Sequence, residues 1–271
     1  MRQSYDLFSG AVAIVKEPDL AKKTELALNL SHDWFHRKVA KGRYDEEALP
    51  QNPGRPEKPA LLPPGKMPKR NLNSEKGRRA HIHALAHIEL GAVDLTWDLI
   101  ARSCGTNLPR TYFDNWVQVG MEEAKHFRLL DQRLKDLSLQ YGDFPAHDGL
   151  WQSCAETAHD LLARLAIIPL VLEARGLDIT PPMIDKTKAL EDFATAKILE
   201  TIYNDEKRHV AFGAKWFRYM CDCEGKRPAE TFQQLVRKHF RGTLKPPFND
   251  KARSAAGLTP QFYKPIASII G

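Results

Sequence analysis

Apolar residues recur along most of the chain at steps of three and four residues, the spacing that gives an α-helix one apolar face. The sequence shows no sustained alternation of apolar and polar residues, which would indicate β-strands. Four long segments carry the helical pattern: 74–103, 111–141, 147–175 and 190–223. Each is followed by a glycine typical of a helix end: Gly105, Gly142, Gly176 and Gly225. Ser74 is a suitable N-cap for the first segment. The pattern predicts an all-α protein with a four-helix bundle at its centre.

Shorter elements flank these four segments. An apolar face predicts a helix over 19–41, and further short helices are expected at 182–189 and 229–241. Seven prolines between 50 and 70 cannot continue a helix and favour an extended segment, either an ordered strap or a linker. The prolines after residue 245 predict an irregular tail laid on the bundle.

The chain has 271 residues, of which 42% are apolar, and can bury a substantial core at the upper size of one domain. We therefore expect one main domain with appendages. Residues 1–73 are expected to form an N-terminal helical extension with the Pro-rich strap, and residues 74–225 the bundle. Residues 226–271 are expected to form a basic C-terminal helix and a tail packed on the bundle.

The sequence contains no clear membrane or export signal. Its apolar stretch at 7–15 includes Ser9 and Gly10 and is much shorter than the roughly 20 residues that span a bilayer. This stretch lacks a basic start and a small-residue cleavage pattern, so we expect no signal peptide. The four cysteines show neither a disulfide framework nor zinc-type spacing, which fits a reducing compartment. Together these features predict a cytoplasmic protein without a membrane partner.

The net charge of +6 is concentrated at the two ends of the chain. Residues 1–73 carry 13 basic and 9 acidic groups, residues 224–271 carry 9 and 3, and the middle has a net charge of −4. A polyanionic partner such as a nucleic acid would therefore meet the ends. Because no nucleic-acid motif accompanies the charge, solvated lysines and arginines that keep the protein soluble are the favoured interpretation.

Two of the long segments carry a glutamate where the helical pattern calls for an apolar residue. Glu89 shares its face with Leu85 and Val93, and Glu173 shares its face with Leu170. An unpaired buried carboxylate is costly, so each glutamate needs a metal ion, an arginine or a proton as its partner.

The other two long segments each carry a glutamate and a histidine three residues apart. These pairs are Glu123 with His126 and Glu206 with His209, and both lie on apolar stripes. At about 100° per residue the two side chains of a pair point within roughly 60° of each other, one turn apart. Both members of a pair can therefore reach one ion.

The intervals between these residues add an independent signal. Glu89 precedes Glu123 by 34 residues, and Glu173 precedes Glu206 by 33. Two Glu-x-x-His pairs, each preceded by a core-facing glutamate, are typical of di-iron and di-manganese carboxylate sites. Four carboxylates balance two divalent cations, and this oxygen and imidazole set suits iron or manganese. We predict two iron ions, with Fe/Mn and Mn/Mn pairs as alternatives, rather than surface salt bridges and packed core histidines. The predicted ligands are Glu89, Glu123, His126, Glu173, Glu206 and His209.

Residues 122–126 (EEAKH) and 205–209 (DEKRH) resemble the acidic-Glu-x-Arg-His signature of the ferritin-like di-iron carboxylate superfamily, with Lys125 where arginine is usual. Within that superfamily, three runs look like the bacterial family called domain of unknown function 455: 86–90, 145–151 and 171–178. The resemblance covers most of the chain, including the strap. It implies a ferritin-like bundle and a metal site but passes on no settled reaction. The superfamily also includes a tRNA hydroxylase.

The resemblance also implies roles for neighbours of the ligands. Glu122 and Asp205 would accept the imidazole N–H of a ligand histidine and fix its tautomer, and Arg208 would pair with such an acid. The alternative for these residues is that they are exposed helix charges.

Three further residues lie near the predicted ligands in sequence. Pro169, one turn before Glu173, removes a helix hydrogen bond and predicts a bend there. Tyr203, one turn before Glu206, is a candidate redox group, although a packed core tyrosine is the favoured interpretation. His87 lies about 200° around the helix from Glu89 and is expected to be an ordinary interhelical or capping histidine.

The leading hypothesis for function is a non-haem di-iron oxidoreductase, a monooxygenase or hydroxylase that uses O2, an electron donor and an unknown substrate. The strap and the basic tail suggest a shaped substrate entrance that iron storage would not need. A ferroxidase-like or iron-binding protein without an organic substrate is the alternative. A third possibility is a metal-stabilised scaffold whose basic ends bind partners. A homodimer is one expected assembly.

Overall fold

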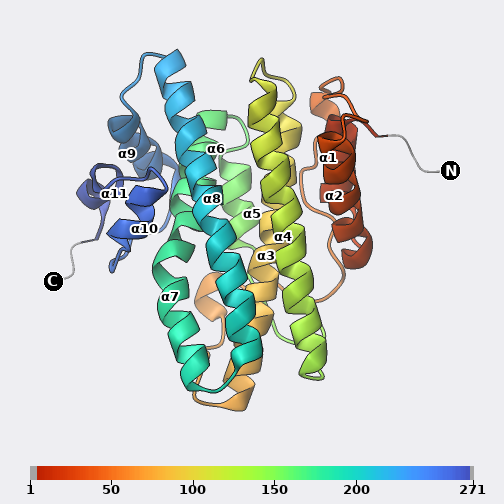
Figure 1. Ribbon diagram of the computed structural model, residues 1–271, viewed down its shortest axis with the longest axis vertical. Coiled ribbons are helices and arrows are strands. Elements are labelled where there is room, and N and C mark those ends of the chain that lie inside the picture. The colour runs from red at the N-terminus through yellow and green to blue at the C-terminus, as the bar shows by residue number, and fades with distance from the viewer. Residues whose placement is uncertain (1–4, 269–271) are drawn as a thin grey trace. The chain divides into compact units, whose positions relative to one another are not determined.

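A computed structural model describes residues 5–268 of the chain (Figure 1). The described residues are helices joined by turns and extended segments, and they contain no β-strand, only two isolated β-bridges. The all-α prediction is therefore confirmed. The chain divides into two compact units, Met1–Gln152 and Ser153–Gly271. The sequence-based division at residues 73 and 225 stays a prediction. None of the described helices combines the length and the apolarity that crossing a membrane requires.

The first unit is built on a hairpin of two long helices. Its helices are α1 (Leu7–Lys16), α2 (Leu20–Phe35), η1 (Glu46–Ala48), η2 (Pro64–Lys66), α3 (Glu75–Ser103), α4 (Arg110–Asp136) and the start of α5 (Gly149–Glu156). Helix α3 packs along α4, α1 covers α3, and α2 covers α4. Gly120 of α4 allows the close approach of the two long helices, because a Cβ there would stand 2.8 Å from the indole of Trp97.

The Pro-rich segment is an ordered strap on this unit. The Gly54 N–H donates to the Val15 carbonyl at 2.8 Å, and the Trp151 indole donates to the Gln51 carbonyl at 3.2 Å. Arg55 reaches from the strap to the Asp148 carboxylate at 2.6 Å. These contacts join residues about 40 to 100 positions apart in sequence, so tertiary hydrogen bonds rather than local propensity order the strap.

The second unit contains the other long helical hairpin. Its helices are α6 (Leu161–Ile167), the π-helical turn η3 (Ile168–Glu173), α7 (Ala174–Ala189), α8 (Phe193–Cys223), α9 (Pro228–His239), α10 (Asp250–Ala255), α11 (Pro260–Tyr263) and η4 (Lys264–Ile266). Helices η3 and α7 pack along α8, and α9 packs on α6 and α11. Asp192 caps the start of α8 by accepting the Thr195 N–H at 3.0 Å.

The structure corrects several predicted helix limits. The segment 147–175 is not one helix, because Asp160 caps a new start after a turn at Thr157. Gly176 does not end the third helix, since its φ is not positive; α7 continues through it to Ala189 and absorbs the short helix predicted at 182–189. By contrast, Gly225 has φ +63° just after α8 and is a true helix stop.

Three further limits differ at the remaining elements. Helix α4 ends at Asp136, five residues before the predicted end at 141, and Ser138 then adopts φ +58°. The N-terminal helix ends at Phe35 rather than 41, and the apolar stretch before it forms α1. The tail predicted to be irregular contains α10 and α11. Asn249 caps the start of α10, and α11 begins with Pro260, a residue suited to the first helical position.

Candidate metal centre

The first unit brings three predicted ligands together between α3 and α4. The Nδ1 atom of His126 lies 3.2 Å from Glu89 Oε2 and 3.5 Å from Glu123 Oε2. Each of the three residues offers one donor atom, and these atoms lie within 4.8 Å of one another. Glu123 and His126 have no exposed surface, and Glu89 is also buried. We call Glu89, Glu123 and His126 the first half-site.

Local sequence explains this convergence. Glu123 and His126 stand three residues apart on one face of α4, and α3 presents Glu89 to that face from the other arm of the hairpin. The hairpin is held in register by its apolar core, including the Trp97 indole against Gly120. The prediction that a core-facing glutamate meets a Glu-x-x-His pair across two consecutive helices therefore has a direct counterpart within this unit.

The second unit repeats the same elements. His209 Nδ1 lies 3.5 Å from Glu206 Oε1 on α8, and both residues are buried. Glu173 is the last residue of η3, and both of its carboxylate oxygens are buried. We call Glu173, Glu206 and His209 the second half-site; the meeting of Glu173 with the other two stays a prediction. In both half-sites the histidine turns its Nδ1 atom toward the glutamate three residues earlier.

Glu173 is the last residue of a π-helical turn. Where a bend was predicted at Pro169 the structure has η3, one wide turn between α6 and α7 that ends on the glutamate itself. Single π-turns inside α-helices occur frequently at functional sites. Gly213 of α8 accommodates this turn, because a Cβ at that position would stand 2.5 Å from Pro169 Cβ and 2.8 Å from its Cγ. The absence of a side chain at Gly213 thus lets α8 approach the turn.

The donor atoms of the first half-site are of the kind that could hold a divalent metal ion. Carboxylate oxygens and a neutral imidazole are the ligands that iron and manganese take in proteins. Burying two carboxylates beside an imidazole is costly without a cation, and a divalent ion compensates that cost. Glu89, Glu123 and His126 present such a set in the first unit; in the second unit Glu206 and His209 form a pair, and the contribution of Glu173 to it stays a prediction.

The predicted neighbours of the ligands make helix-internal contacts. Arg208 donates to Asp205 at 2.7 Å, and the Gln118 amide donates to Glu122 at 3.2 Å. Asp205 and Glu122 are buried rather than exposed. Their predicted contacts to imidazole N–H groups stay a prediction. The acidic partner predicted for Arg208 is thus present as Asp205.

Tyr203 is oriented by contacts outside the ligand set. Its ring lies under Lys207 Nζ at 4.1 Å from the ring centre, and its hydroxyl accepts the Asn249 side-chain amide at 3.4 Å. The side chain is half-buried. These contacts link α8 to the N-terminus of α10 and indicate a structural position for Tyr203, so a redox role finds no support in them.

Sequence reasoning also missed a buried histidine and tyrosine cluster in the first unit. His87 Nδ1 lies 2.7 Å from the Tyr141 hydroxyl, and its Nε2 lies 3.1 Å from the His147 carbonyl. His83 stacks on Tyr141 and accepts the Gly142 N–H at its Nε2 at 2.8 Å. Burial lowers the pKa of His83 and of His87 to about 4, so both rings are neutral at pH 7. His87 thus joins α3 to the loop between α4 and α5, where Tyr141 and His147 lie, rather than to another helix.

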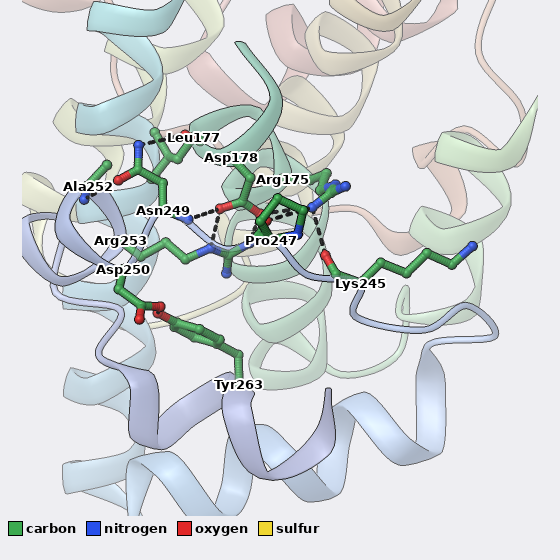
Figure 2. A network of polar contacts seen from close by, with 10 residues as sticks. All are labelled: Arg175, Leu177, Asp178, Lys245, Pro247, Asn249, Asp250, Ala252, Arg253 and Tyr263. Atoms are coloured by element: carbon green, nitrogen blue, oxygen red, sulfur yellow. Dashed lines mark hydrogen bonds and ion pairs between the residues drawn. The ribbon is translucent and has the colours of Figure 1, made fainter. Parts of the chain in front are cut away.

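The C-terminal arm, residues 245–263, braces α7 just beyond Glu173 (Figure 2). Asp178 of α7 receives two hydrogen bonds from the Arg253 guanidinium of α10, at 2.8 and 2.7 Å, and both side chains are buried. Arg175 donates to the Lys245 carbonyl at 2.8 Å. Figure 2 shows these side chains converging on the carboxylate of Asp178.

Asn249 completes the brace. Its backbone N–H donates to Asp178 at 2.9 Å, and its side-chain amide donates to the Leu177 carbonyl at 3.2 Å. Pro181 lies four residues after Leu177 and has no N–H to bond that carbonyl, so Asn249 supplies the missing donor. No pattern in the sequence pairs positions 177 and 249, and only the folded arm reveals this contact.

Comparison with known proteins assigns the chain to no characterised activity. The family model described as "Protein of unknown function (DUF455)" matches residues 16–264. An uncharacterized protein of Haemophilus influenzae is 40% identical over 210 residues, which cover 75% of this chain and 73% of that protein. The chain matches no solved structure.

Proposed function

The chain belongs to the DUF455 family of proteins of unknown function, and from this premise we propose that it is a non-haem di-iron oxidoreductase that uses O2. In this proposal the hairpin α3/α4 and the hairpin η3–α7/α8 are the two halves of a ferritin-like four-helix bundle. The two half-sites then share one dinuclear centre with six protein ligands.

One observation carries the proposal: each unit contains a buried Glu-x-x-His pair and, on an earlier helical segment, one glutamate with a buried carboxylate. Nothing in packing alone requires a carboxylate at both positions, since buried acids destabilise a fold unless they are compensated. A half-set of two carboxylates and one imidazole leaves a divalent ion short of the usual ligand number. Two such sets on consecutive hairpins supply four carboxylates and two imidazoles, the ligand set of dinuclear carboxylate centres.

Bound there, a pair of iron ions would supply electrons to O2 in concert. The residues of the chain have separate tasks. Glu89, Glu123 and His126 would hold one side of the centre and Glu173, Glu206 and His209 the other. The apolar cores of the hairpins would exclude bulk water, which limits side reactions. The π-turn η3 would set the reach of Glu173.

The strap and the C-terminal arm favour an enzyme over an iron store. Both are ordered, and both are attached by specific hydrogen bonds: Arg55 to Asp148 in the first unit, and Arg253 to Asp178 in the second. Ordering such long segments costs conformational entropy, and iron storage alone would not require them to be ordered. A monooxygenase or hydroxylase acting on an organic substrate is therefore the function we infer.

Metal loading tests the shared centre. Protein purified from iron-replete cells is expected to hold about two iron ions per chain, and the Mn(II)-loaded form is expected to give the electron paramagnetic resonance spectrum of a coupled pair. A six-line spectrum of isolated Mn(II) would contradict a shared centre. Glu123→Ala and Glu206→Ala, which remove one ligand from each half-site, should each abolish the coupled spectrum.

Oxygen consumption tests the reaction class. The reduced di-iron protein is expected to consume O2 in a single burst and then to stop, because no electron donor is present to reduce the iron again. Continued turnover with excess Fe(II) would instead indicate a ferroxidase. No reaction with O2 would overturn the oxidoreductase proposal while leaving the metal centre intact.

A further inference from the structure

Helix α2 ends on two exposed histidines that stand one turn apart. His32 and His36 are four residues apart, and their rings stack with centroids 4.0 Å apart and planes inclined by 26°. Residues at this spacing are neighbours on a helix surface. The His32 side chain is 54% exposed, and His36 is exposed as well.

Hydrogen bonds select the same tautomer in both rings. His32 Nδ1 lies 3.2 Å from the Asp33 carboxylate, and His36 Nδ1 lies 2.8 Å from the His32 carbonyl. Carboxylate and carbonyl oxygens only accept hydrogen bonds, so each Nδ1 carries the proton. In a neutral imidazole the lone pair is then on Nε2. Both histidines therefore present an Nε2 lone pair.

These two lone pairs face solvent rather than a protein partner. Among the hydrogen bonds described for residues 5–268, those of the two rings use Nδ1, and neither Nε2 atom has one. Lys38 forms an ion pair with the Asp33 carboxylate at 3.4 Å. The hydrogen bond from His32 and the nearby Lys38 lower the pKa of Asp33, so this carboxylate stays ionised and continues to hold the His32 ring.

We propose that His32 and His36 form a surface binding site for a divalent late first-row metal ion, of the Cu²⁺, Ni²⁺ or Zn²⁺ class. Two histidines at this spacing on a helix are a known zinc-binding arrangement. An imidazole whose other nitrogen donates to a carboxylate or a carbonyl is the usual form of a metal-binding histidine. Water would complete the coordination shell at this exposed position.

The site differs in chemistry from the buried half-sites and does not rest on the proposed function. It has two imidazoles and no coordinating carboxylate, which favours Cu²⁺, Ni²⁺ and Zn²⁺ over Fe²⁺ and Mn²⁺. It also uses Nε2 atoms, whereas the half-site histidines turn Nδ1 toward their glutamates. Bound ions would exchange freely with solvent, and they would appear as an additional ion in any metal count.

The experiment titrates the full-length chain with Cu²⁺ and Zn²⁺ and compares it with a matched variant. In Asn29→His/His32→Asn one histidine exchanges places with an asparagine, so composition is unchanged and both altered positions are exposed. The histidines then stand seven residues apart, about 10 Å along the helix, and cannot share an ion. Ions held elsewhere in the protein contribute equally to both titrations and cancel in the comparison.

The wild-type chain is expected to bind one more Cu²⁺ ion than the variant. The affinity for this ion should be about 100-fold higher than that of a single histidine, because the second ligand acts intramolecularly. The Cu²⁺ resonance spectrum should show two equivalent nitrogens, and only one in His36→Ala. Equal titrations of the wild-type and exchanged chains would overturn the proposal. So would a wild-type spectrum with a single nitrogen ligand.

Discussion

Gly213 of α8 lies directly against Pro169 in the π-turn that carries Glu173. A Cβ at residue 213 would stand 2.5 Å from the Pro169 Cβ, a separation that real side chains do not reach. The contact couples the path of α8 to the turn that ends on Glu173. Because Glu206 and His209 are on α8, this contact links their helix to the turn that carries Glu173.

Gly213→Ala is expected to destabilise the protein and to disturb the second half-site. Alanine in a helix interior is ordinarily more favourable than glycine, so propensity alone predicts a gain. Overpacking against Pro169 should reverse that gain, with a net loss of about 1–3 kcal/mol in the free energy of unfolding measured in urea. Mn(II) affinity should fall as the turn moves.

Gly176→Ala is the matched control for this effect. Gly176 is also within a helix, and the nearest atom to a Cβ at this position would be Glu206 Cγ at 4.0 Å, an ordinary contact distance. This substitution should raise stability by about 0.5–1 kcal/mol. If both alanine variants were stabilised, the Pro169 contact would not constrain the turn.

Asp178→Asn should remove the charge that compensates the buried guanidinium of Arg253. Removing one partner of a buried ion pair leaves the other charge uncompensated and costs about 3–5 kcal/mol. Urea unfolding is the measurement, and the second unit should unfold first. Glu230→Gln breaks the exposed pair with Arg227 and should leave the midpoint unchanged, because water screens such pairs.

The stability of the first unit should depend on pH through His83. Burial lowers the pKa of folded His83 from 6.5 to about 4, whereas the unfolded chain takes up the proton near pH 6.5. Unfolding therefore binds a proton between these values, and the free energy of unfolding falls as the pH falls through that window. Above about pH 6.5 this contribution is constant.

His83→Gln isolates the effect, since the glutamine oxygen can still accept the Gly142 N–H. Urea unfolding of both proteins at pH 7 and pH 5 gives the two stability differences. The wild-type chain should lose more stability than the variant on acidification. A difference that does not change with pH would mean that folded His83 titrates normally.

Helix faces and local caps account for what the sequence predicted correctly. Ser74 caps α3 and Gly225 ends α8 because both act through hydrogen bonds and dihedral angles of their own neighbourhood. The pairing of Glu123 with His126 follows from helical spacing alone. Features of this kind need no information about distant parts of the chain.

Features that depend on distant residues could not be predicted. Gly176 has the sequence signature of a helix stop, yet its conformation is set by the continuation of η3 into α7. The short helix α10 is held by Asp178, more than 70 residues earlier in the sequence. The sequence predicted a bend at Pro169, but the π-helical form of the turn there depends on the room that Gly213 provides.

The effect of Glu123→Gln on stability should depend on metal: the substitution should stabilise the metal-free protein and destabilise the metal-bound protein. Two carboxylates and an imidazole lie within 4.8 Å of one another, so without an ion the two negative charges repel each other in a buried place. Glutamine keeps the shape and removes one charge. The metal-free variant should therefore be more stable than the wild type, by about 1 kcal/mol, as is common when a functional site is neutralised.

Metal should reverse this order because the wild-type carboxylate binds the ion and the amide does so poorly. Binding to the native state raises the melting temperature of the wild type in proportion to the logarithm of metal concentration over the dissociation constant. Melting curves with EDTA and with Mn(II) test the reversal. Asp131→Asn, on the exposed side of α4 where Asp131 pairs with Lys135, should shift equally under both conditions. A variant less stable than wild type in EDTA would show that Glu123 is compensated within the protein and needs no ion.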